Sequence, residues 1–196
     1  MTSSIAAEDI CNMALDMLIE APITSLNDND PNARRFKRNF DQWRDMFLSS
    51  HPWNFATKRV SIPADSTGPA HGWDYRYLLP GECLRFLPLR MSGEFEGNII
   101  PHEIEGQYIL TDESPPLKAR YIWRNEAYGS WSPEAINAFA GLLAAKVAMA
   151  ITGKNSVLQT AETNADNLLG AAKRLDGMQS HTERPSYQDV ISVRYV

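Results

Sequence analysis

The chain has 196 residues, 43% of them hydrophobic and 22% charged, a composition ordinary for a folded protein that buries a substantial core. Its 19 basic and 24 acidic residues give a net charge of -5, which excludes a protein that coats nucleic acid through its whole surface. Cys11 and Cys83 stand far apart, without partners at metal-ligand spacing, so neither a disulfide framework nor a zinc site is predicted. We expect both thiols to be reduced and buried.

Neither a signal peptide nor a membrane anchor is predicted. The first twenty residues include four acidic side chains and lack a basic start and a cleavage site. The longest apolar stretch, residues 138–151, contains Lys146 and is shorter than a bilayer-spanning helix. We therefore expect a protein that folds in a cytoplasm.

Two helices are predicted in the first quarter of the chain. Apolar residues recur at helical spacing from Ile10 onward and Pro22 ends this pattern, which predicts a helix over about residues 5–19. Asp30 can cap a second helix that has Pro31 at its first position. The core-facing stripe predicted for this helix is mainly aromatic and consists of Ala33, Phe36, Phe40, Trp43 and Phe47.

The middle of the chain is predicted to form β structure. Most of the twelve prolines lie here, among short runs that contain Val, Ile, Tyr and Trp. Pro80-Gly81 and Glu105-Gly106 are turn signals between these runs. The predicted strands are residues 58–62, 75–79, 83–89, 98–100, 107–110 and 118–123.

A second pair of helices follows the β region. Ser132 can cap a third helix, in which residues 135–151 are almost all small or apolar, so protein should surround it on most sides. Gly153 closes this helix, and the fourth has a 3-4 apolar spacing that suits packing against another helix. The chain ends in strand formers at residues 190–196 that have no local core to join. We expect this end to pair with a partner.

The order of these elements predicts an α+β fold that is mainly α, with a four-helix bundle, an inserted antiparallel β domain and an extended C-terminal tail. The expected divisions are a helical hairpin at 1–56, the β domain at 57–131, the second helical pair at 132–178 and the tail at 179–196.

No motif predicts a catalytic residue, a cofactor or a metal site. Gly153-Lys154-Asn155-Ser156 lacks the first glycine and the hydroxyl residue of a phosphate-binding loop, so we interpret it as a turn between helices. A glycan hydrolase would need two carboxylates about 5 to 10 Å apart. That alternative stays open because the β region contains Glu82, Glu94, Glu96, Glu103 and Glu105, although nothing marks a pair.

A basic cluster near the start of the second helix consists of Arg34, Arg35, Lys37 and Arg38. Such a cluster can contact phosphate, which leaves a small DNA-binding module as another alternative. Modules that read bases or stack on single strands normally carry a broader basic footprint. We therefore favour a solvated or subunit-contacting face.

One block carries a specific resemblance. At His51-Pro52-Trp53-Asn54-Phe55-Ala56, after Arg44-Asp45 on a helix, the sequence resembles the tail tubular protein A family, the head-to-tail adaptors of short-tailed bacteriophages. The resemblance covers about residues 5–180, with Glu82 where an aspartate is expected. Further matching elements are Asn12-Met13-Ala14-Leu15, Ile23-Thr24-Ser25, Trp73-Asp74-Tyr75-Arg76-Tyr77, Leu79-Pro80, Cys83-Leu84-Arg85 and the alanine-rich helix around Phe139.

The resemblance implies a structural protein and not an enzyme. It implies a homo-oligomeric twelve-fold ring at the head-tail junction of the virion, assembled from subunits made in the cytoplasm of the host bacterium. One face would dock on the portal protein and the other on the tail nozzle, a tail tubular protein B-like partner. Double-stranded DNA would pass through the central channel without sequence-specific contacts, and we expect the channel wall not to be strongly basic.

Two sets of residues are assigned roles on this basis. We expect an extended tail segment to pair its backbone with the portal or a neighbouring subunit. The residues expected to do so are Tyr187, Val190, Ile191, Val193, Tyr195 and Val196. The family block His51, Pro52, Trp53, Asn54 and Phe55 is expected to be structural.

Overall fold

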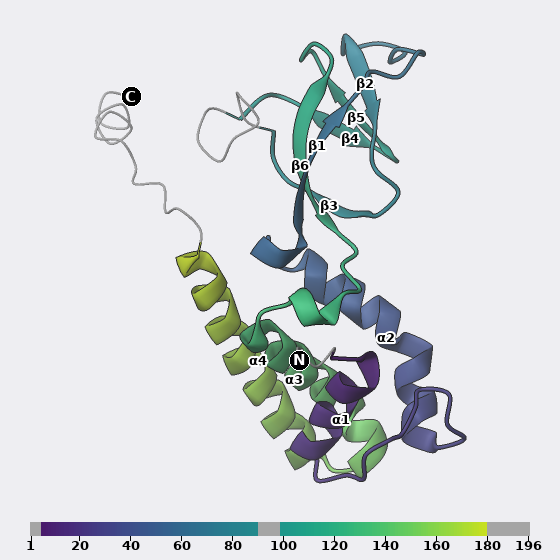
Figure 1. Cartoon of the computed structure of the whole chain (residues 1–196), viewed down its shortest axis with the longest axis vertical. Helices are drawn as coiled ribbons and strands as arrows, with labels where there is room; N and C mark the ends of the chain where they lie inside the picture. Colours follow the sequence, from purple (N-terminus) through teal and green to yellow (C-terminus); the bar gives the residue numbers. More distant parts are fainter. Residues whose placement is uncertain (1–4, 90–98, 180–196) are drawn as a thin grey trace.

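The computed structural model describes residues 5–89 and 99–179, which form an α+β fold with the helices at one end and the sheets at the other (Figure 1). The four α-helices are α1 (Ala7–Met17), α2 (Pro31–Ser49), α3 (Pro133–Thr152) and α4 (Asn155–Met178). Two short 3-10 helices, Asn54–Ala56 and Tyr128–Ser130, lie where the chain passes between the two ends.

The β region forms two three-stranded antiparallel sheets. The first has the order β1-β6-β3, with β1 (Thr57–Ile62), β6 (Leu117–Trp123) and β3 (Cys83–Phe86). The second has the order β2-β5-β4, with β2 (Tyr75–Leu78), β5 (Tyr108–Thr111) and β4 (Glu103–Glu105). Their small shared core consists of Ile62, Tyr77, Leu89, Ile109, Leu117 and Ala119.

The predicted caps fix the ends of the helices. The Asp30 carboxylate accepts hydrogen bonds from the first backbone amides of α2, and Pro31 occupies the first position. Ser132 caps α3 in the same way through the N–H of Ala135. Gly153 ends α3 with a φ of 65°, a conformation that glycine adopts without a steric penalty.

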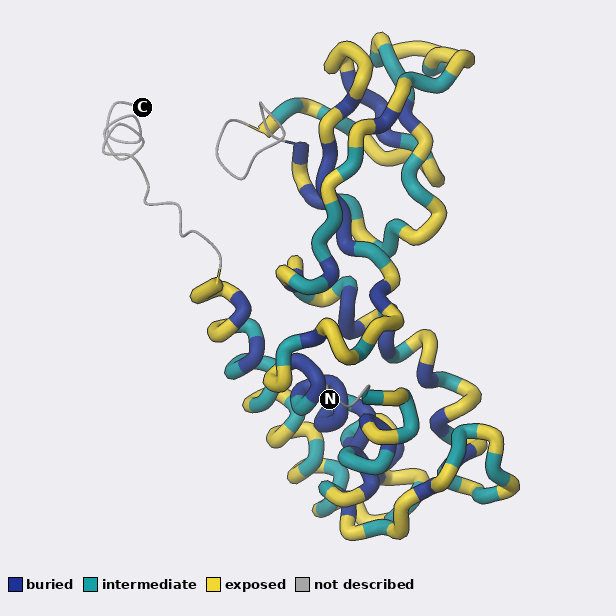
Figure 2. Tube along the Cα trace, viewed as in Figure 1, coloured by how far each residue is buried: buried dark blue, intermediate teal, exposed yellow. Residues whose placement is uncertain are grey.

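The larger core surrounds α3, which packs against α4, α1 and α2. Ten residues of α3 are buried, five of them alanine, and Figure 2 shows the helix as a dark-blue centre between more exposed neighbours. A Cβ at Gly141 would lie 2.8 Å from Leu168 Cδ1 of α4, so the glycine allows α3 and α4 to approach closely. The small residues of the sequence thus set the spacing of this helix pair.

Four expectations require correction. The strand expected at residues 98–100 is not formed by the described residues, because Ile99 makes only an isolated bridge. The edge strand of the second sheet is β4 instead. All three residues of β4 are exposed, so it lacks the apolar alternation that marks a strand. The strand expected over residues 83–89 is shorter than predicted, because β3 ends at Phe86.

The second helix and Cys83 also differ from expectation. Arg44 is buried, whereas Trp43 is only partly buried, so a charged residue takes the place predicted for an aromatic one. Cys83 is only partly buried, although Cys11 is fully buried as expected.

The apolar helix α3 has 20 residues and is longer than the stretch predicted to be too short for a bilayer. By length and composition it could cross a membrane, and 56% of its most apolar window is buried within the chain. Its packing against the other three helices is that of a core helix.

Candidate functional site

The family block forms the junction between the helices and the first sheet. Trp53 is fully buried, and its ring stacks on Phe47 of α2 at a centroid distance of 5.0 Å. The indole Nε1 donates a hydrogen bond of 3.2 Å to the Phe47 carbonyl. The Thr57 hydroxyl, at the first residue of β1, donates to the Trp53 carbonyl at 2.7 Å. Trp53 therefore fixes the direction in which the chain leaves α2 and enters the sheet.

The same block holds the last turn of α4 through Asp176. This carboxylate is 6% exposed and accepts hydrogen bonds from the Asn54 backbone N–H at 3.1 and 3.4 Å. The Asn54 side-chain amide donates to the Asp176 carbonyl at 2.8 Å. His51 Nε2 lies 3.3 Å from Asp176 Oδ2, and burial lowers the pKa of His51 more than this carboxylate raises it. Two segments that are 122 positions apart are thereby tied together.

Asp176 was not predicted as a site residue. It stands four positions after Ala172, the buried residue on the α3-facing side of α4. The helical period places Asp176 on the same buried side as Ala172. A carboxylate at such a position needs a partner, and this could have marked Asp176 as a site residue. The identity of its partners could not be predicted, because they come from a distant turn.

The other side of the block contacts the connection between β6 and α3. The Asn125 side-chain amide, 1% exposed, donates to the Phe55 carbonyl at 2.9 Å. The ring of Phe55 stacks on Trp131 at 5.1 Å. Trp131 in turn stacks on Phe47, so one aromatic cluster joins α2, the block and the start of α3.

An ion-pair network around the buried Arg44 also stabilises the junction. Its guanidinium lies 3.0 Å from Asp41, 3.0 Å from Asp45 and 3.1 Å from Glu126. Asp45 also pairs with Arg124, which follows β6, at 2.8 Å. The network therefore links α2 to the segment that leaves the first sheet. Its sequence signal is the acidic residues at positions i−3 and i+1 from Arg44.

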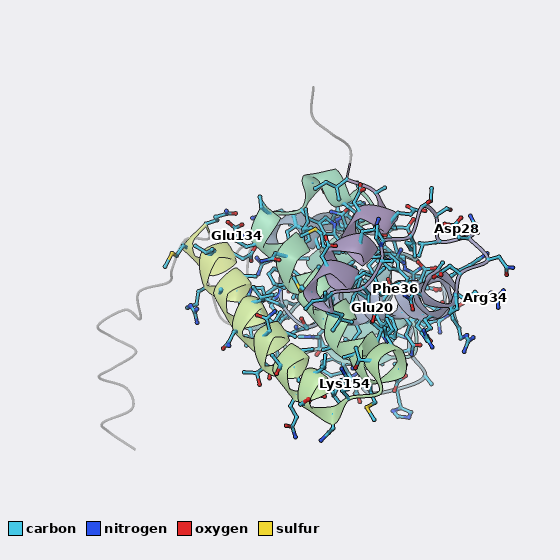
Figure 3. The ribbon with its side chains drawn as sticks, turned by 90° about the horizontal axis from the view of Figure 1, so that it is seen from below. Glu20, Asp28, Arg34, Phe36, Glu134 and Lys154 are labelled. Carbon is cyan, nitrogen blue, oxygen red and sulfur yellow. The ribbon has the colours of Figure 1, made fainter. Side chains whose placement is uncertain are left out.

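The predicted basic cluster lies on the N-terminal half of α2, away from this junction. Arg34, Lys37 and Arg38 are exposed and Arg35 is partly exposed. Side-chain hydrogen bonds from Arg34, Arg35 and Lys37 go to asparagine oxygens of Asn29, Asn32 and Asn27, respectively. Among the described residues, none of the four cations has a carboxylate within ion-pair distance. In Figure 3, Arg34 lies on the side of the molecule remote from α4.

The acidic residues of the β region differ in environment. Glu82 accepts hydrogen bonds from Lys58 Nζ at 2.9 Å and the Tyr121 hydroxyl at 2.8 Å, and these lower the pKa of Glu82. A general acid for glycan cleavage needs the opposite shift. Glu103 and Glu105 are exposed on β4, and Glu94 and Glu96 lie outside the described residues.

Within residues 5–89 and 99–179, no group of three or more His, Cys, Asp or Glu side chains is placed to hold a metal ion. Burial raises the pKa of the Cys11 thiol to about 12 and, to a lesser extent, that of Cys83.

The tail residues predicted to bind a partner all lie outside the described residues. They are Tyr187, Val190, Ile191, Val193, Tyr195 and Val196.

No family model matches the chain, and comparison with curated proteins gives no match.

Proposed function

We propose that the chain is a structural head-to-tail adaptor of a short-tailed phage virion. Copies form a twelve-fold ring between the portal protein and the tail nozzle, and DNA leaves the head through the ring. The subunit has no enzymatic activity and no cofactor in this role. It is made in the host cytoplasm and ends in the tail of the virion.

The observation that carries this proposal is the position of the His-Pro-Trp-Asn-Phe block. This block is the most specific part of the resemblance, and in the fold it ties α2, the first sheet and the end of α4 together through Trp53 and Asp176. An adaptor must hold surfaces for different partners at a fixed separation. A buried aromatic cluster supported by the Arg44 network provides that rigidity.

The last described turn of α4 is the point in the chain from which the predicted tail continues. Residues 179–196 follow directly from the turn of α4 that Asp176 holds against Asn54. In the proposed adaptor, the four helices act as one bundle that carries the β region of residues 57–131. The tail from Tyr187 to Val196 pairs with the portal or a neighbouring subunit.

The direct test is the mass of the purified protein with and without its portal, measured by light scattering and followed by electron microscopy. The adaptor should give a closed ring in the presence of the portal. A protein that stays monomeric and ignores the portal would contradict the proposal. A chain ending at Met178 should bind the portal less well, and normal joining by that chain would exclude the role of the tail.

A DNA-binding module is the second candidate, because the cations of the basic cluster are exposed and make no ion pair with the described residues. This function predicts that the free protein binds duplex DNA with an affinity that falls steeply with salt. Weak, salt-independent retention of DNA by the free protein would exclude it.

A further inference from the structure

We propose that the basic face of α2 in one copy binds the acidic middle of α4 in the next copy. The basic face is Arg34, Arg35, Lys37 and Arg38, and the acidic middle is Glu162 and Asp166 with the polar hollow beside them. This inference deepens the proposed function, on which it rests, by naming the contact that joins neighbouring subunits in the ring.

The basic face has positive charge that the described chain does not neutralise. The nearest acidic residues along the chain are engaged elsewhere: Asp28 accepts the backbone amides of Thr24 and Ser25, Asp30 caps α2, and Asp41 pairs with Arg44. Exposed cations of this kind attract a partner of opposite charge and exclude a partner of like charge.

The middle of α4 has the complementary charge. Glu162 and Asp166 are exposed, stand four positions apart on one side of the helix, and form no ion pair with the described residues. The basic residues of α4 and its cap, Lys154, Lys173 and Arg174, lie towards the two ends of the helix. The central turns therefore carry a net negative charge.

A shallow, open hollow lies along neighbouring residues of α4, and its lining does not include Glu162 or Asp166. It has a volume of about 500 Å³ and is lined by polar side chains of α4, which are Ser156, Gln159, Thr160, Thr163, Asn164 and Asn167. Hydroxyl and amide oxygens accept hydrogen bonds from a guanidinium, which has five donors. The lining thus fits arginine side chains better than an apolar partner.

The spacing of the two faces matches. Arg34 and Arg38 are four positions apart, as are Glu162 and Asp166, so each pair is separated by about 6 Å along its helix. Two ion pairs can therefore form together when α2 of one copy lies beside α4 of another. Figure 3 shows α4 and the side of α2 that carries Arg34 on opposite sides of the molecule. Contacts between different patches on opposite sides join subunits head to tail. Such contacts close into a ring when the rotation that relates one subunit to the next permits closure.

The first test captures the contact as a disulfide between two full-length variants, Arg38→Cys and Asp166→Cys, mixed at low salt under mild oxidation. The control is Ser66→Cys, which places a thiol at an exposed position in the β region. The pair Arg38→Cys and Asp166→Cys should cross-link about tenfold faster than either variant with Ser66→Cys, and about 0.5 M salt should remove the difference because exposed charges are then screened. The native thiols should react slowly, because burial raises the pKa of both. Equal rates for all pairs would overturn the proposal.

The second test exchanges the charges and uses portal-dependent ring formation as the readout. Arg34→Glu with Arg38→Glu should prevent the ring, as should Glu162→Arg with Asp166→Arg, and the chain with all four changes should recover it. Rings formed by both charge-reversed chains, or no recovery in the exchanged chain, would overturn the interface. If wild type forms no ring while the specific cross-link persists, the adaptor function fails and the contact stands. A ring without the specific cross-link gives the opposite conclusion.

Discussion

Replacing Asp176 by asparagine should weaken the attachment of α4 to the junction. The native carboxylate accepts the Asn54 N–H and contacts His51 from a nearly buried position. A hydrogen bond to a charged group contributes about 1.5 to 3 kcal/mol, whereas a neutral one contributes about 1 kcal/mol. The isosteric amide keeps one acceptor oxygen, so we expect the free energy of unfolding to fall by about 1.5 kcal/mol.

The assay is equilibrium denaturation followed by the fluorescence of the five tryptophans, of which Trp53 and Trp131 lie in the same junction. A loss of this size should lower Tm by about 3 to 6 °C in a chain of this length. The matched control is Asp166→Asn on the same helix, where the carboxylate is exposed, and its effect should stay within about 0.5 kcal/mol. If Asp176→Asn and Asp166→Asn unfold at the same denaturant concentration, the junction does not depend on this carboxylate.

Three further predictions test the packing and the charges. Gly141→Val should cost about 2 to 3 kcal/mol by overpacking the α3–α4 contact. Gly170→Ala, whose Cβ would lie at an ordinary contact distance of 3.7 Å from Arg174 Nη1, should stabilise by about 0.5 to 1 kcal/mol in thermal unfolding. Arg44→Met should cost about 3 kcal/mol by leaving the network without its central cation, while Arg38→Met should be near neutral in the same denaturation assay. The pKa of Glu82 is lower in the fold than its ordinary value of 4.5. The ionised carboxylate therefore stabilises the folded protein above pH 4.5, and this stabilisation is lost as the pH falls through the folded pKa. Glu82→Gln should therefore cost at most about 0.5 kcal/mol at neutral pH and progressively less under acidic conditions, as measured by unfolding across that range.

The sequence by itself determined the elements whose signals are local. The caps Asp30 and Ser132 and the terminating Gly153 act within one helical turn, so they predicted where α2 and α3 begin and where α3 ends. The small and apolar composition of residues 135–151 predicted the central helix, because such a surface is stable only when other elements cover it.

Only the tertiary structure decided the residues that join distant segments. Asp176 and Asn54 are 122 positions apart, and no local pattern specifies that the end of α4 meets the family block. Arg44 took a buried position because acids from α2 and from the β6–α3 connection surround its guanidinium, which compensates the cost of removing the charge from water. The edge strand β4 was missed because its residues are all exposed, and its pairing depends on the neighbouring strand β5. Local free energies fix helix ends, whereas partners across the fold are fixed by the simultaneous packing of all the elements.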